Sequence, residues 1–311
     1  MHTKSLKVFC DVVGRRSFSK AADENAISQS GVSQMVHHLE EHLGVKLIDR
    51  SKRPFVLTPE GEVYYQGCRK LIDRMDALED AVRSLRQDTS GKVIVASIYS
   101  AGLSHIKGYV QEFIAQYPKA QVSVEYHHPD KIYDLIDNDQ ADLGLVSYHK
   151  STRSIKAIPW HEERMVLACA PGHPFADRNA IALGDLDGQE MVGFVNQLRI
   201  RRALDRAISS HGAEVKLVME FDNIDTLKRA IEINAGISLL PEPTLAREVR
   251  EGTIVAVPLN GEGLVRPLGI IHRRGKSLGT TAERFIELLQ EKSSIQVGEE
   301  NDNGHMRTRE R

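Results

Sequence analysis

The sequence predicts an α/β protein with an N-terminal winged helix-turn-helix, a long linker helix and a larger C-terminal α/β domain. Apolar residues recur at helical spacing in the first 44 residues, with a tight turn between two short helices. A heptad-spaced apolar series follows over residues 64–85, and strand-like and helix-like segments alternate from residue 93 onward. A length of 311 residues is enough for about two domains.

Composition and charge narrow the classes of function. The formal net charge of −2 excludes a globally basic protein that coats nucleic acid and an acidic solvating tail protein. No apolar run approaches the roughly 18 residues that span a bilayer, and the N-terminus lacks the pattern of a signal peptide. Cys10, Cys68 and Cys169 are too far apart to form a disulfide framework or a CxxC zinc pair. We therefore expect a cytoplasmic, nucleoid-associated protein with no membrane partner.

Charge is unevenly distributed along the chain. Residues 1–57 contain nine Lys and Arg against six Asp and Glu, a net of +3, so the remainder carries −5. A basic segment on a mildly acidic body is typical of local binding to a polyanion, although it also occurs by chance on soluble surfaces.

The first segment is predicted as helix, short helix, turn and helix. The first helix spans Ser5–Val13, Ser17 caps the second, and Asn25–Ile27 forms the turn. Ser28 caps the third helix, which ends at Gly44. This order is the helix-turn-helix pattern.

The outward face of the third helix carries small and amide-bearing side chains, which suit hydrogen bonding to base edges. Two short apolar runs, Leu47–Ile48 and Phe55–Leu57, flank a basic turn and predict a two-stranded wing. The basic residues of this turn would contact phosphates or the minor groove, although a solvated hairpin is the alternative. The residues predicted to contact DNA are Ser17, Ser19, Gln29, Ser30, Ser33, Gln34, His37, Arg50, Lys52 and Arg53.

A linker helix is predicted from Thr58, which caps it, followed by Pro59 and Glu60. Its apolar positions are spaced four and three residues apart, as in a coiled coil, so it needs a partner helix, and a symmetric dimer supplies one. The predicted dimer seam consists of Tyr64, Cys68, Leu71, Met75, Leu78, Val82 and Leu85.

The C-terminal part alternates between strands and helices, which predicts a parallel sheet. Its predicted strands are 93–97, 122–126, 142–146, 165–170, 190–195, 216–221, 236–240 and 268–271. Its predicted helices are 103–116, 132–136, 199–211, 225–234 and 281–291.

The first 61 residues closely resemble the DNA-binding head of LysR-type transcriptional regulators. The resemblance is carried by Arg16–Ala22, Ser28–Gln34, Leu39–Glu40, Leu43–Val45, Arg50, Arg53 and Leu57–Gly61. The sequence departs from the family pattern at Ile48, where Phe is frequent, and at His37 and His38, where Lys or Gln is frequent; the histidines affect base preference rather than fold.

The resemblance implies a C-terminal effector domain of two α/β subdomains, like a periplasmic binding protein. The expected domains are the winged head at 1–61, the linker helix at 58–90 and the effector domain at 91–293, with a disordered tail at 294–311. Subdomain I would span about 91–163 and 266–293, and subdomain II about 164–265. The implied partners are double-stranded promoter DNA, a second copy of the chain, further copies in a tetramer, a small-molecule effector and RNA polymerase.

No catalytic constellation is predicted. The segment His161–Met165 begins like a zinc-binding HExxH motif but has Met in place of the second ligand, and no GxSxG or GxGxxG motif occurs. His38 and His42 could hold a metal, but no acid or cysteine ligand is evident beside them, and His127 and His128 are expected at the surface. We expect no enzyme activity, cofactor or metal.

Polar residues follow several predicted strands, where ligands of open α/β sheets bind near helix N-termini. Without an obvious carboxylate cluster among them, these residues favour a small anionic effector between the subdomains, although Ser100 and Asn223 could simply cap helices. The predicted effector contacts are Tyr99, Ser100, Ser147, Asn196, Gln197 and Asn223.

The leading hypothesis is a ligand-responsive transcriptional regulator. One alternative is a small-molecule carrier or sensor whose head contacts proteins, and the basic wing counts against it. The other is an enzyme with a regulatory head, which lacks a nucleophile, a base or a metal set.

Overall fold

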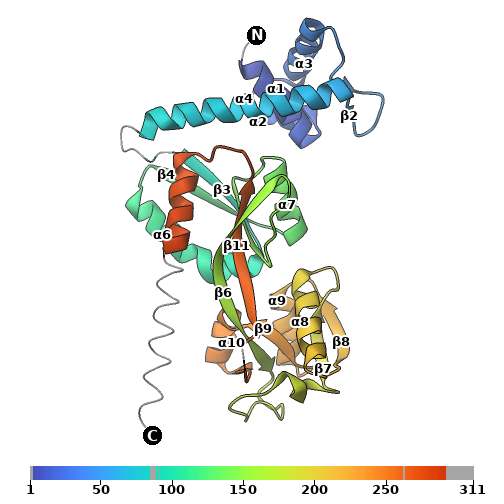
Figure 1. Ribbon diagram of the computed structural model, residues 1–311, viewed down its shortest axis with the longest axis vertical. Coiled ribbons are helices and arrows are strands. Elements are labelled where there is room, and N and C mark those ends of the chain that lie inside the picture. Colours follow the sequence, from blue (N-terminus) through green and yellow to red (C-terminus); the bar gives the residue numbers. More distant parts are fainter. Residues whose placement is uncertain (1–2, 85–88, 90, 262, 292–311) are drawn as a thin grey trace.

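The chain folds into three parts that follow one another along its length (Figure 1). In the computed structural model a small helical head lies at one end, the long helix α4 crosses beside it, and a body of two lobes extends away from α4. The structure describes residues 3–84, 89, 91–261 and 263–291. The predicted tail at 294–311 and seam residue Leu85 lie outside the described residues.

The predicted helix-turn-helix and wing are confirmed in the head, residues 3–57. It consists of α1 (Thr3–Arg15), α2 (Phe18–Glu24), α3 (Gln29–Leu43), β1 (Ile48–Asp49) and β2 (Val56–Leu57). Ser17 caps α2 by accepting a hydrogen bond from the Lys20 N–H at 3.3 Å. Ser28 caps α3 by accepting one from the Gly31 N–H at 3.1 Å. Gly44 ends α3 in the left-handed conformation, with φ of 70°.

Helix α4 (Pro59–Ser84) begins where the sequence predicts. The Thr58 hydroxyl accepts a hydrogen bond from the Gly61 N–H at 2.9 Å and donates one to the Lys46 carbonyl at 2.6 Å. A Cβ at Gly61 would lie 1.9 Å from the Leu47 carbonyl oxygen, so only glycine allows α4 to lie this close to the wing.

Subdomain I begins with the parallel strands β3 (Gly91–Ser97), β4 (Ala120–Tyr126) and β5 (Leu143–Ser147). The helix predicted from residue 103 begins earlier, as α5 (Tyr99–Ala101), a π-helical turn η1 (Gly102–Ile106) and α6 (Lys107–Gln116). Helix α7 (Pro129–Asp137) and a last helix at 280–291 complete this lobe.

Two long strands correct the prediction of an all-parallel sheet. Strands β6 (Ile155–Cys169) and β11 (Val265–Arg273) are antiparallel to each other, and β11 is antiparallel to β5. The prediction began the first of these strands at Met165 because Pro159 and the charged residues that follow hide its strand pattern. Together they form the middle of a seven-stranded mixed sheet in the order β10-β6-β11-β5-β3-β4, with β9 also paired to β6.

Subdomain II surrounds the other ends of β6 and β11. It contains β7 (Glu190–Phe194) and β8 (Lys216–Phe221), which pair in parallel, with α8 (Arg199–Ser210) and α9 (Ile224–Glu232). Strand β9 (Ser238–Pro241) was predicted, whereas η2 (Leu183–Leu186), η3 (Glu242–Leu245), α10 (Ala246–Glu251) and β10 (Val255–Val257) were not.

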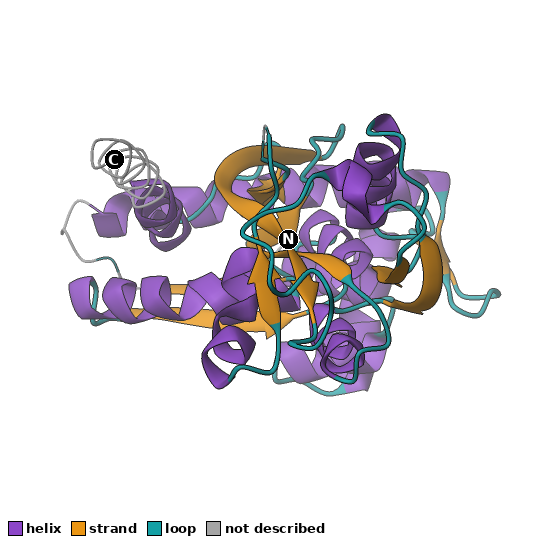
Figure 2. Cartoon of the chain, turned by 90° about the horizontal axis from the view of Figure 1, so that it is seen from below, coloured by secondary structure: helices purple, strands orange, loops and turns teal. Residues whose placement is uncertain are grey.

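The head and each of the two subdomains have their own buried cluster. One cluster fills the head, one runs from Val93 to Leu289 in subdomain I, and one from Met165 to Val257 in subdomain II. Seen from below, the strands of the body lie in the middle with helices on both sides (Figure 2). Within the described part of the chain, no helix is both long and apolar enough to cross a membrane.

Candidate nucleic-acid interface and ligand cleft

Helix α3 presents one face to the head core and the opposite face to solvent. Val32, Val36 and Leu39 are buried, as the helical spacing predicts. Of the residues predicted to read bases, Ser33 is half-buried and the others are exposed: Gln29, Ser30, Gln34 and His37. The exposed face therefore offers hydroxyl, amide and imidazole groups to a groove.

The wing places its basic residues beside α3. Arg50 donates a hydrogen bond to the Ser33 hydroxyl at 3.3 Å, and its guanidinium lies 5.1 Å from the centre of the Phe18 ring. Lys52 and Arg53 are exposed at the turn. Ser19 is exposed on α2, whereas Ser17 is half-buried and its hydroxyl oxygen accepts the hydrogen bond that caps α2.

A buried carboxylate joins α3 to the wing. Glu40 is 3% exposed and accepts hydrogen bonds from the backbone N–H groups of Leu47 at 2.9 Å and Ile48 at 3.2 Å. Burial alone would raise the pKa of Glu40, but these hydrogen bonds and Lys46 hold it below its ordinary value. The charged form of Glu40 thus fixes the angle between α3 and the wing.

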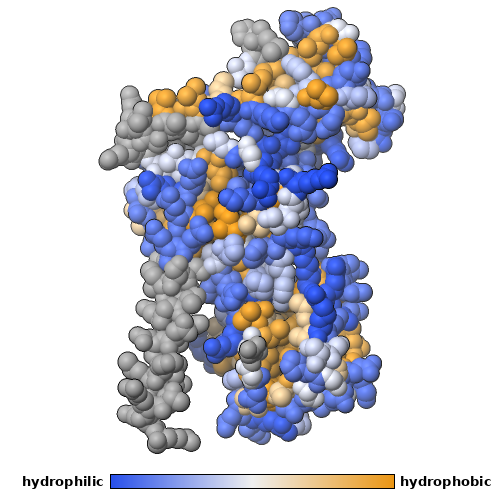
Figure 3. All heavy atoms as spheres, in the orientation of Figure 1, coloured by the Kyte–Doolittle hydropathy of each residue, from blue (hydrophilic) through white to orange (hydrophobic). Residues whose placement is uncertain are grey.

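The structure divides the predicted dimer seam into two parts. Tyr64 and Cys68 pack within the core of their own head, and Cys68 is 2% exposed, so Cys68 cannot contact a second chain; this corrects the prediction. Helix α1 covers this part of α4, which the heptad spacing could not reveal. The remaining described positions are exposed and unpaired in one chain, as the apolar surface along α4 shows (Figure 3): Leu71, Met75, Leu78 and Val82.

A cavity of about 640 Å³ lies between the two subdomains. Five of the six predicted effector contacts line it: Tyr99, Ser100 and Ser147 from subdomain I, and Gln197 and Asn223 from subdomain II. Asn196 is exposed and is not among the residues that line it. The Asn223 side chain also caps α9, where it accepts a hydrogen bond from the Thr226 N–H at 2.9 Å.

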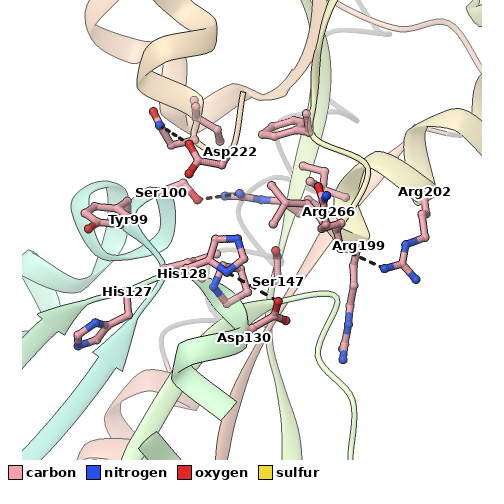
Figure 4. Close-up of a pocket in the computed structure, with 18 of the residues that line it drawn as sticks. Tyr99, Ser100, His127, His128, Asp130, Ser147, Arg199, Arg202, Asp222 and Arg266 are labelled. Carbon is pink, nitrogen blue, oxygen red and sulfur yellow. Dashed lines mark hydrogen bonds and ion pairs between the residues drawn. The ribbon is translucent and has the colours of Figure 1, made fainter. Parts of the chain in front are cut away.

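A buried arginine that the sequence did not single out lines the cavity beside Ser100 (Figure 4). Arg266 is 2% exposed and donates a hydrogen bond from Nη1 to the Ser100 hydroxyl at 2.9 Å. Since the Ser100 oxygen accepts this bond, its own proton is free to point at a ligand. The Nη2 of Arg266 has no hydrogen-bond partner among the described residues, although it forms an ion pair with Glu163.

Glu163 holds Arg266 in place from behind the cavity. Its carboxylate accepts a hydrogen bond from Arg266 Nε at 2.5 Å and contacts His105 Nε2 at 2.7 Å. Burial would raise the pKa of Glu163, but the hydrogen bond with His105 and the charge of Arg266 hold it below its ordinary value. In the sequence, Glu163 stands out only as part of the incomplete HExxH motif at His161–Met165.

Charged groups of both signs surround the mouth of the cavity. Arg199 donates to the Tyr148 carbonyl at 2.9 Å and lies over the Tyr133 ring, which links α8 of subdomain II to subdomain I. His127 and His128, expected at the surface, follow the end of β4 and line the cavity with Asp130. Three carboxylates, Asp130, Asp222 and Asp225, line the cavity, although the sequence shows no obvious carboxylate cluster among the strand-end residues.

Two signals in the sequence could have found the missed residues. Arg266 stands between apolar residues just before a predicted strand, and Arg199 begins a predicted helix directly after Gln197 and Leu198. Within the described ranges, no group of three or more His, Cys, Asp or Glu residues is placed to hold a metal ion.

Two sequence profiles match the chain. That of the bacterial regulatory helix-turn-helix proteins of the lysR family covers residues 3–62, and that of the LysR substrate binding domain covers residues 86–294.

Similar proteins and structures extend over nearly the whole chain. The HTH-type transcriptional regulator CysL of Bacillus subtilis is 25% identical over 96% of this chain and 99% of its own length. The uncharacterized HTH-type transcriptional regulator YfeR of Shigella flexneri is 28% identical over 96% of this chain and 97% of its own length. The structure of a full-length OxyR variant from Pseudomonas aeruginosa has a TM-score of 0.76 at 19% identity and covers 94% of both chains.

Proposed function

The chain belongs to the LysR family of DNA-binding transcriptional regulators, and on that premise we propose that it binds promoter DNA as a dimer under the control of a small anionic effector. Proteins of this family are regulators rather than enzymes; they bind promoter DNA and small-molecule effectors and form oligomers.

The proposed DNA contacts are supported by their exposure on two adjoining elements. Helix α3 offers Gln29, Ser30, Gln34 and His37 to the major groove, while the wing offers Lys52 and Arg53 to the backbone or the minor groove. Arg50 and Ser33 bond to each other, so Arg50 supports α3 as well as facing the DNA.

The exposed part of the seam supports the proposed dimer. Leu71, Met75, Leu78 and Val82 form an unpaired apolar strip on α4 in a single chain. A second copy of α4 would cover this strip and set the two heads at a fixed spacing, which suits a pseudo-palindromic site.

The observation that carries the effector proposal is the buried guanidinium of Arg266 beside Ser100. A ligand that accepts a hydrogen bond from Ser100 also comes close to this positive charge and to the first turns of α8 and α9, whose partial charge favours anions. Arg199 and Arg202 at the mouth have no ion-pair partner among the described residues and add to this preference. Aspartates also line the cavity and repel an anion. The anionic group of the ligand should therefore lie beside the arginines.

A thermal-shift screen of the full chain with inorganic sulfate, phosphate and a panel of small carboxylates tests this assignment. An anion that binds raises the melting temperature by mass action, and Ser100→Ala should abolish the rise. Ser210→Ala, an exposed hydroxyl at the end of α8 outside the cavity, is the matched control and should leave it unchanged. An anion that stabilises Ser100→Ala as much as the wild type would refute the assignment of the cleft.

A further inference from the structure

A cluster of charged side chains joins α4 to subdomain I, and none of its members lines the cleft or belongs to the proposed DNA contacts. It contains three cations and three anions, each with 11–28% of its side chain exposed. Two members come from α4 and four from subdomain I. This junction cluster consists of Arg69, Asp73, Asp139, Asp142, Arg273 and Lys276.

Arg273 and Arg69 make the contacts that cross the junction. Arg273, at the end of β11, donates to Asp139 at 2.7 Å and pairs with Asp73 of α4. Arg69 of α4 donates from Nε to Asp139 at 3.0 Å and from Nη2 to the Asp137 carbonyl at 2.8 Å. Asp139 thus receives one guanidinium from each side of the junction.

The body side of the cluster is anchored to the sheet, and the head makes a further contact beside it. Asp142 accepts hydrogen bonds from the Ile94 N–H of β3 at 2.8 Å and from Lys276 at 3.1 Å. Gln140 donates to the carbonyl of Gly14, at the end of α1, at 3.0 Å. Helix α4 therefore meets a surface whose charges are already fixed in position.

The cluster and the dimer seam occupy opposite sides of α4. Arg69 and Asp73 are four residues apart and share one face. At about 100° per residue, Leu71 and Leu78 lie on the other side, where Figure 3 shows apolar surface along the edge of α4 away from the body. Contact with the body therefore leaves the seam free for a second chain.

We propose that the charged end of subdomain I is a docking surface for α4 of the same chain, and that it holds the DNA-binding head in one orientation on the effector domain. Complementary charges specify orientation more than they add affinity, so docking of this kind is reversible and sensitive to salt. Arg273 and the cleft residue Arg266 lie on the same strand, β11, seven positions or about 23 Å apart. Helix α4 thus contacts one end of a strand whose other end lines the cleft.

Cross-linking in the full chain tests the docking. A Cβ added at Gly14 would lie 3.6 Å from the Asn138 carbonyl oxygen, so Gly14→Cys with Asn138→Cys places two thiols across the junction. A short bismaleimide should join them within one chain, and peptide mapping separates this product from reactions of the native cysteines. Adding Arg273→Glu should lower the yield about tenfold, and combining it with Asp73→Arg should restore most of it.

Two further variants keep the test decisive. Arg284→Glu makes the same charge change at an exposed pair with Glu287 on the same lobe and should leave the yield unchanged. Asp73→Lys reverses the charge on α4 without altering the body, so it reports on docking even if Arg273→Glu unfolds subdomain I. Absence of the intrachain product, or an equal yield with Asp73→Lys, would overturn the proposal.

Discussion

In the head, the side chains proposed to contact DNA are exposed on α3, a helix of 15 residues, and on the neighbouring hairpin. The cleft instead brings together residues that are far apart in the sequence, such as Ser100 and Arg266. The head groups make few contacts within the protein. In the cleft, Ser100 and Arg266 belong to a chain of contacts that continues through Glu163 to His105, and Glu163 and Arg266 in its middle are buried. In the head, binding chemistry and stability reside in different residues, but in the cleft they reside in the same ones.

This difference predicts how each region responds to substitution. A change on the exposed face of α3 should alter DNA affinity and leave the fold unchanged, because surface substitutions shift stability by only about 0.5 kcal/mol. A change in the cleft cluster should alter both ligand affinity and stability.

The largest effect is expected where the head depends on a partner. Leu71→Asp with Leu78→Asp places two charges in the exposed strip of α4 and should abolish the dimer while each head stays folded. Because two linked heads bind through a high effective concentration, specific DNA affinity should fall by about 10²–10⁴-fold. Light scattering and gel shift measure the two effects. Ile233→Asp, at another exposed apolar residue, is the control, and a double variant that remains dimeric and binds tightly would contradict the seam.

The second effect contrasts two arginines, one in each region. Arg266→Ala leaves Glu163 buried without its ion-pair partner and should cost about 3–5 kcal/mol of unfolding free energy. Arg53→Ala, at the exposed turn of the wing, should cost almost none. Urea unfolding followed by the fluorescence of Trp160, the single tryptophan and a residue of subdomain I, measures the effect of Arg266→Ala, and circular dichroism of the helices follows the head in Arg53→Ala. Equal stability of the two variants would mean that the buried cluster does not hold the body together.

The same contrast explains how much could be predicted from the sequence. Apolar spacing and caps such as Ser28 and Gly44 locate the head helices, because every signal lies within a few residues of the element it defines. The exposed face of α3 follows directly from the buried one. The heptad spacing located α4, but not the packing of α1 against Cys68, which is a contact between distant segments.

The cleft could be predicted only in part, for the same reason. Polar residues after strands marked Ser100 and Gln197, since each lies at the start of a helix. Arg266 and Glu163 lie inside long strands whose charged residues obscured the strand pattern, and only the pairing of β6 with β11 brings them together. The junction cluster was likewise hidden, because Asp73 and Arg273 meet across 200 positions of the chain.

The third effect tests whether the exposed face of α3 reads bases. Gln34→Ala removes an amide that could pair with a base edge and should cost about 1–3 kcal/mol at a specific promoter site, with little change on random DNA. Arg53→Ala should weaken binding to both DNAs and lower the salt dependence of binding by about one unit. Gel shifts over a salt series measure both. Equal losses on the two DNAs from Gln34→Ala would place Gln34 on the backbone rather than on a base.

The smallest effect concerns a place where the head resembles the cleft, the buried carboxylate of Glu40. Because its pKa is held below the ordinary value, its charged form stabilises the head above the unfolded pKa of about 4.3, and this stabilisation is lost as the pH falls through the lower folded value. Glu40→Gln removes the charge but keeps one acceptor, so the wing should lose about 1 kcal/mol of stability at pH 7.

Hydrogen exchange at the Leu47 and Ile48 amides, which donate hydrogen bonds to Glu40, measures this loss locally. The difference between variant and wild type should shrink below about pH 4, as the wild-type carboxylate becomes protonated. A difference that stays constant from pH 7 to pH 3 would show that Glu40 acts through its shape and not through its charge.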